Sequence, residues 1–189
     1  MAVMREALDF QAVEERVKVI LRDLLPGFSS RYGYEPGTNT YELARPGDDA
    51  DVLQRAFGGE SLPAGVAPFF SYFSKFSFPD IQNGYFIGPP SWTAAIYENA
   101  EPRGISNGTF QHDLISLGSD GGGNLFAALA SRDSAVYRLP EGRIRDGLYV
   151  VRPGKSLASL EIADSFNIFI SKLIDGFERT VRHQADMPY

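Results

Sequence analysis

Cysteine is absent from the 189-residue chain. Its absence excludes disulfide bonds, thiol nucleophiles and zinc sites with sulfur ligands. Residues 1–8 lack the apolar core of a signal peptide, and no apolar run approaches the roughly 18 residues that a membrane-spanning helix needs. These absences predict a soluble protein of the reducing cytoplasm that does not bind a membrane.

Basic residues are scarce in the middle of the chain. The net charge is −6, residues 31–131 contain 11 acidic and 5 basic side chains, and the two flanking segments together are neutral. An acidic surface repels phosphate groups and attracts basic proteins, which argues against nucleic-acid binding and for a basic protein partner. Ordinary solvated acidity explains this composition equally well.

The candidate partner-binding residues lie where acidic residues are close together and bases are few. They are Glu35, Glu42, Asp48, Asp49 and Asp51. Positive charge on a partner would accelerate its association with such a segment. The alternative is that these side chains form a solvated face and that the partner binds elsewhere, for example on a sheet.

Two helices are predicted in the first third of the chain. Apolar residues at the 3.6-residue period predict the first helix, which ends at Pro26-Gly27. These apolar residues are Val13, Val17, Ile20, Leu21 and Leu24. A second, short helix is predicted over residues 48–57, with an aspartate as its N-cap. Residues 32–43, between the two helices, are predicted to form an edge hairpin.

An aromatic-rich segment covers residues 62–78. Its apolar residues share one helical face, but Pro63 and Pro68 both interrupt the pattern. Either Pro68 lies in the first turn of a short helix, which we favour, or Pro63 starts a helix that is kinked. The residues on this face are Val66, Phe69, Phe70 and Phe73. Aromatic residues at helical spacing are more often core than cofactor-binding, and we expect these to be core.

Strand signals begin after Pro79. Asn83-Gly84, between strand-like residues, predicts a hairpin, and Asn107-Gly108 predicts a second turn. Residues 91–99 fit a helix or a strand equally well. Further strands are predicted over residues 114–117, 125–129, 135–139 and 148–151.

A glycine turn over residues 119–124 is predicted to join two of these strands. Gly121, Gly122 and Gly123 are expected to supply the positive φ angles of a tight turn. The turn lacks the lysine and hydroxyl residues of a phosphate-binding loop and the alternating acids of a calcium loop. We therefore interpret it as structural.

The chain closes with an amphipathic helix, capped by Asp164 or Ser165. Its apolar stripe is Phe166, Phe169, Ile170, Leu173, Ile174 and Phe177. The order of elements predicts an α+β fold: a mostly antiparallel sheet, helices packed on one side, and an additional N-terminal helix. One domain is expected over residues 1–189, with an N-terminal helical extension and loop (1–47), a core (48–178) and a flexible tail (179–189).

Three segments carry a resemblance to a known family. They are Leu62-Pro63 with Phe69-Phe70 and Tyr72-Phe73, the glycine turn within residues 115–126, and Val136-Tyr137 followed by residues 162–170. In this order, they resemble the Leu-Pro opening, the glycine turn and the Ser-Phe-x-x-Phe closing helix of the SUKH superfamily, in its Smi/Knr-like branch. The resemblance covers about residues 50–178; Asn124, where the family often has aspartate, Pro68 and the N-terminal helix depart from its pattern.

The resemblance implies an α+β fold without known catalysis or cofactor. Bacterial members of the superfamily act as immunity proteins that neutralise toxins, and fungal members act as cell-wall regulators. The resemblance therefore implies that this chain is an immunity protein or antitoxin that binds a cognate toxin, expected here to be a basic domain. The alternative is a structural or regulatory adaptor that has no toxin partner. A monomer or weak homodimer is expected.

The residues themselves do not assemble an acid, a base and a nucleophile into a catalytic site. His112-Asp113 with Ser119 lacks the nucleophile elbow of a hydrolase. His183 with Asp186 supplies two possible metal ligands in a terminal segment, too few for a site. We therefore expect a binding protein with no catalytic residues, no metal and no cofactor.

Overall fold

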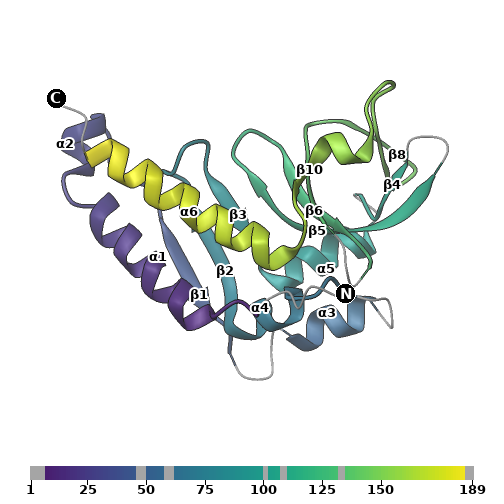
Figure 1. The fold of residues 1–189 in the computed structure, drawn as a ribbon, viewed down its shortest axis with the longest axis horizontal. Helices are drawn as coiled ribbons and strands as arrows, with labels where there is room; N and C mark the ends of the chain where they lie inside the picture. Colours follow the sequence, from purple (N-terminus) through teal and green to yellow (C-terminus); the bar gives the residue numbers. More distant parts are fainter. Residues whose placement is uncertain are drawn as a thin grey trace, which may run out of the picture.

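The computed structural model describes residues 7–45, 50–57, 62–99, 102–106, 110–131 and 135–185 (Figure 1). The helices are α1 (Phe10–Leu24), α2 (Phe28–Tyr32), α3 (Ala50–Phe57), α4 (Val66–Tyr72), α5 (Pro90–Glu98) and α6 (Phe166–Ala185), with a 3-10 helix at Leu157–Leu160. The strands are β1 (Thr40–Leu43), β2 (Phe73–Phe78), β3 (Tyr85–Ile87), β4 (Gly104–Ser106), β5 (Gln111–Asp120), β6 (Leu125–Leu129), β7 (Val136–Leu139), β8 (Arg143–Arg145), β9 (Leu148–Val150) and β10 (Glu161–Ala163). The predicted α+β class and N-terminal helix are confirmed.

The strands form one sheet that branches at β5. Along the main path the order is β1-β2-β3-β5-β4-β9-β8, and β6, β7 and β10 continue from β5 on a second path. The start of β5 pairs with β4, its end with β3 and its middle with β6. β4 and β9 pair in parallel, and the other described pairings are antiparallel. The sheet is therefore mostly antiparallel, as predicted.

The N-terminal helix is part of the main core. Asp9 caps α1 by accepting hydrogen bonds from the backbone N–H groups of Gln11 and Ala12. α1 lies beside α6 across one face of β1–β3 (Figure 1), and Arg16 bridges to Asp175 and Glu178 of α6 at 2.6 and 2.7 Å. The apolar stripe of α1 belongs to the same buried cluster as that of α6.

Aromatic rings fill the space between the helices and the sheet. Phe69 of α4 lies 5.2–5.3 Å, centroid to centroid, from Phe76 of β2 and from Phe166 of α6. Phe78 of β2 lies 5.0 Å from Phe177, which is further along the same stripe of α6. Edge-on packing of this kind adds to the burial energy of each ring. The predicted stripe of the closing helix is buried throughout.

Several local predictions needed correction. Pro68 lies in the first turn of α4, as favoured, but Phe73 begins strand β2 instead of continuing the helical face. Residues 79–84 form a longer loop than the predicted Asn-Gly hairpin, because Phe78 pairs with Tyr85. The ambiguous segment 91–99 lies almost entirely in helix α5.

The two ends of the main sheet path also differ from expectation. Residues 32–43 do not form a hairpin: α2 ends at Tyr32, and β1 pairs with β2 as an edge strand. Tyr41 lies opposite Phe76 in this pairing, and its ring lies 6.1 Å from that of Phe73. At the other edge, β8 lies in a segment that carried no strand signal.

The expected tail is shorter than predicted, because α6 continues past residue 178 to Ala185 and buries Val181. Within the described part of the chain, no helix is both long and apolar enough to span a membrane.

Candidate functional site

The glycine turn joins β5 to β6 and is organised by the Asp120 carboxylate. Its Oδ1 accepts hydrogen bonds from the backbone N–H groups of Gly122 and Asn124, each at 3.0 Å. Both of its oxygens accept from the Asn124 side-chain amide at 2.8–2.9 Å. Arg138 of β7 donates to Oδ2 at 2.6 Å, and the Asp120 side chain is only 3% exposed. The turn therefore holds an ion pair whose carboxylate is buried and whose arginine side chain stays about half exposed.

The environment of Asp120 keeps it ionised. Burial by itself raises the pKa of this carboxyl, but hydrogen bonds from Asn124 and Arg138, together with the charge of Arg138, hold the pKa below its usual value. Because its oxygens already accept these bonds, Asp120 has little capacity left for a metal or substrate. The interpretation of the turn as structural agrees with this geometry.

The three glycines of the turn have different roles, which the sequence did not separate. Gly123 alone among them has a left-handed backbone, with φ of +81°. A β-carbon at Gly121 would overlap the carbonyl oxygen of Asn83 in the loop between β2 and β3. At Gly122 it would lie 3.3 Å from Asp120 Oδ1. The expectation of positive φ is therefore wrong for Gly121 and Gly122.

Two further carboxylates have lowered pKa values, and both join α1 to its neighbours. Glu14 accepts hydrogen bonds from the hydroxyls of Tyr72 at 2.6 Å and Tyr41 at 3.1 Å, and the Tyr72 bond contributes most to its lowered pKa. The bond from Arg16 likewise lowers the pKa of Glu178. A carboxylate with a lowered pKa is a weak base, so these groups are suited to cross-linking elements and poorly suited to proton transfer.

The structure does not bring the candidate acidic residues together. Glu35 follows α2 and accepts a hydrogen bond from Ser29, Glu42 on β1 pairs with Lys75 at 3.5 Å, and Asp51 is exposed in the first turn of α3. Figure 1 shows α2 and α3 well apart along the long axis of the molecule. Asp48 and Asp49 lie outside the described residues. The three described acids are thus exposed but dispersed.

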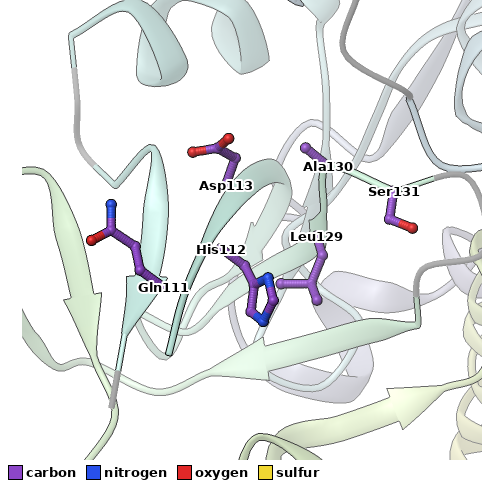
Figure 2. A pocket seen from close by; sticks show the side chains of 6 residues that line it. All are labelled: Gln111, His112, Asp113, Leu129, Ala130 and Ser131. Carbon is purple, nitrogen blue, oxygen red and sulfur yellow. The ribbon is translucent and has the colours of Figure 1, made fainter. Parts of the chain in front are cut away.

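A polar hollow of about 520 Å³ lies at the start of β5 and the end of β6 (Figure 2). Figure 2 shows the side chains of His112 and Asp113 pointing away from each other, because neighbouring residues of a strand face opposite sides. Ser119 lies near the other end of β5. His112, Asp113 and Ser119 therefore do not form a hydrolase triad. His183 lies on α6, and Asp186 is outside the described residues.

A second hollow, of about 190 Å³, lies between α6 and the sheet. We call it the α6 groove; its lining residues are Tyr85, Phe126, Arg138, Ile162, Phe169, Lys172 and Leu173. Its floor is aromatic, since Tyr85 stacks on Phe126 at 6.1 Å and Phe126 lies 5.2 Å from Phe169. Its rim carries the cationic groups of Arg138 and Lys172. None of its lining residues in the described part of the chain carries a carboxylate.

Sequence reasoning did not identify the α6 groove because four strands and one helix contribute to it. Phe126 and Arg138 are neighbours only through the pairing of β6 with β7, and Tyr85 reaches Phe126 from β3. The usable signals were a lone arginine between apolar residues of one strand and a lysine beside the apolar stripe of the closing helix. Both signals are weak without the register of the sheet.

No family model matches this chain, and neither a curated protein nor a solved structure is significantly similar to it.

Proposed function

We propose that this chain is a non-catalytic protein-binding domain that neutralises a cognate toxin by direct binding, as an immunity protein or antitoxin. The observation that carries the proposal is the α6 groove, an apolar hollow of about 190 Å³ with a cationic rim. Small-molecule sites usually enclose roughly 300–1,000 Å³, whereas protein interfaces are centred on pockets that take single side chains. The groove fits the second kind of site.

The ionisable groups support binding over catalysis. Among the residues that the structure describes, the carboxylates with altered pKa are those of Glu14, Asp120 and Glu178; all three are shifted downward, and each accepts hydrogen bonds within the protein. General acid–base catalysis at neutral pH needs a pKa near neutrality. The α+β class of the fold is the class that the SUKH resemblance implies, and the resemblance itself is part of this proposal.

The net charge of −6 favours a toxin of positive net charge. Long-range attraction depends on the whole charge distribution, so it does not require Glu35, Glu42 and Asp51 to be adjacent. Such attraction mainly increases the association rate, and salt screens it over about 8–10 Å at physiological ionic strength. Added salt should therefore slow association with the toxin and leave dissociation nearly unchanged.

The test is co-expression with candidate toxins encoded beside this gene, followed by surface-plasmon kinetics with the purified pair. We expect restored growth and a stable complex. Absence of both would overturn the proposal and would favour the adaptor alternative.

Two triple variants separate local from overall charge. The first variant reverses the charge of the three candidate partner-binding acids that the structure describes, and these changes are Glu35→Lys, Glu42→Lys and Asp51→Lys. We call the region of these acids the acidic segment. Glu141→Lys, Glu161→Lys and Asp164→Lys are the matched control, because these side chains are also exposed and the net charge changes equally. Slower association with the first variant alone would assign the attraction to the acidic segment, whereas equal slowing would assign it to the net charge.

A further inference from the structure

The floor of the α6 groove is rigid and apolar. Tyr85 and Phe126 stack with an interplanar angle of 7°, and Phe177 closes the stack at 5.1 Å from Tyr85. The Tyr85 hydroxyl donates to Gln82 at 2.7 Å, and Gln82 in turn donates to Thr180 of α6 at 2.9 Å. This chain of hydrogen bonds ties the loop after β2 to α6 and holds the rings in place. A preformed floor of this kind needs little reorganisation to receive a side chain.

The rim of the groove is positively charged. Arg138 keeps 47% of its side chain exposed while its inner edge binds Asp120. Lys172 is exposed, and its ammonium donates to the carbonyl oxygen of Ile162 at 2.9 Å. Because Asp120 balances Arg138, Lys172 supplies the excess positive charge. Arg179 lies two helical turns from Lys172 on the same line of α6 and extends that charge.

The acidic residues of the middle of α6 are bound by a residue of α1. Asp175 and Glu178 face α1, where Arg16 binds both of them. Both acids thus have an ion-pair partner on α1, and neither lines the groove. A ligand in the groove would meet cations and no lining carboxylate. Complementary charge at such a rim determines which partner segment fits.

We propose that the α6 groove is the anchor site for an acidic segment of the partner protein, which inserts one large apolar side chain between α6 and the sheet. The apolar side chain contacts Phe126, Phe169 and Leu173, and the neighbouring carboxylates meet Lys172 and Arg138. This inference rests on the proposed protein-binding function and names the local chemistry of the partner. A toxin of positive net charge can carry such a segment, because net charge governs approach and local charge governs docking.

The test uses random 12-residue peptides displayed on phage and selected on the full-length protein. We expect the selected peptides to combine one large apolar residue with aspartate or glutamate within a few positions. Lys172→Glu should weaken their binding at least about tenfold, since it reverses the charge at the rim. Arg182→Glu is the matched control: it lies on the same helix, is exposed and points to the α1 side, where it pairs with Glu178. It should change affinity less than about twofold.

Two further measurements keep the test independent of folding defects. Lys172→Met removes the charge and keeps an apolar stem of similar length, and it should weaken binding less than Lys172→Glu does. Aromatic NMR signals of Tyr85 and Phe126 should shift when a selected peptide is added. Any one of four results would overturn the inference. The selection could yield basic peptides or no peptide at all, Lys172→Glu and Arg182→Glu could weaken binding equally, or the ring signals could stay unshifted.

The outcomes separate this inference from the proposed function. If Lys172→Glu still neutralises the toxin and no selected peptide depends on the groove, the anchor site is rejected and the antitoxin function is kept. If acidic peptides bind in the groove but the protein neutralises no toxin, the anchor site is kept and the antitoxin function is rejected.

Discussion

The molecule contains two hydrophobic clusters that differ in size and in origin. The larger cluster joins α1, α4 and α6 to the sheet and is dominated by phenylalanine rings. The smaller cluster is formed mainly by β4–β7 and β9, and its residues are Ile105, Leu114, Ala127, Tyr137, Leu139, Tyr149 and Val151. Ala127 and Ala128, adjacent on β6, contribute to different clusters because successive side chains of a strand face opposite sides. The comparison shows that this part of the sheet is buried on both faces.

The larger cluster should tolerate truncation least. Phe166 is fully buried and lies 5.2 Å from Phe69. Phe166→Ala should reduce the free energy of unfolding by about 3–5 kcal/mol, because a cavity forms among rings held by three elements. Urea denaturation measures the loss. A loss below about 1 kcal/mol would mean that the closing helix does not organise this cluster.

The smaller cluster should be affected less by a comparable change. Ile105 is fully buried on the short strand β4. Ile105→Ala should cost about 2–3 kcal/mol, toward the lower end for this substitution, because neighbouring short strands can partly close the cavity. The same urea titration checks it. A cost above that of Phe166→Ala would reverse the ranking of the two clusters.

Asp120 is a buried polar residue at the end of β5, where the glycine turn begins. Asp120→Asn tests how much this carboxylate stabilises the fold. The substitution places an amide where two oxygens accept bonds from Asn124 and Arg138, and it should cost about 2 kcal/mol at pH 7.

The pH dependence follows from the lowered pKa of Asp120, whose usual value is 3.8. Its stabilisation is fully present above that unfolded-state value and is lost as the pH falls through the lower pKa of the folded protein. The difference in unfolding free energy between the native protein and Asp120→Asn should therefore shrink below about pH 4. A constant difference from pH 7 to pH 2 would contradict the ion-pair explanation.

The smallest expected effects distinguish the glycines of the turn. Gly123→Ala should cost about 1 kcal/mol because its left-handed backbone disfavours a side chain. Gly121→Ala should cost more, about 1–3 kcal/mol, because the added carbon meets the backbone of Asn83. Thermal unfolding followed by circular dichroism ranks the two. The reverse order would show that the loop between β2 and β3 moves away easily.

Local periodicity was enough to predict the elements whose signal lies within one stretch of chain. The stripes of α1 and α6, the turn between β5 and β6, and the helical turn at Pro68 needed only neighbouring residues. Such patterns report which side of an element is buried. They do not report what covers it.

By itself, the sequence determined the α+β class, the amphipathic helices at both ends and the position of the glycine turn. Tertiary structure decided the features that depend on partners distant in the chain: Phe73 entering a strand, β1 pairing with β2, and β8 at the far edge. It also dispersed Glu35, Glu42 and Asp51 and assembled the α6 groove. The physical reason is that strand register and helix docking are decided by contacts between segments far apart in sequence, whereas a helical stripe or a tight turn is encoded in a few consecutive residues.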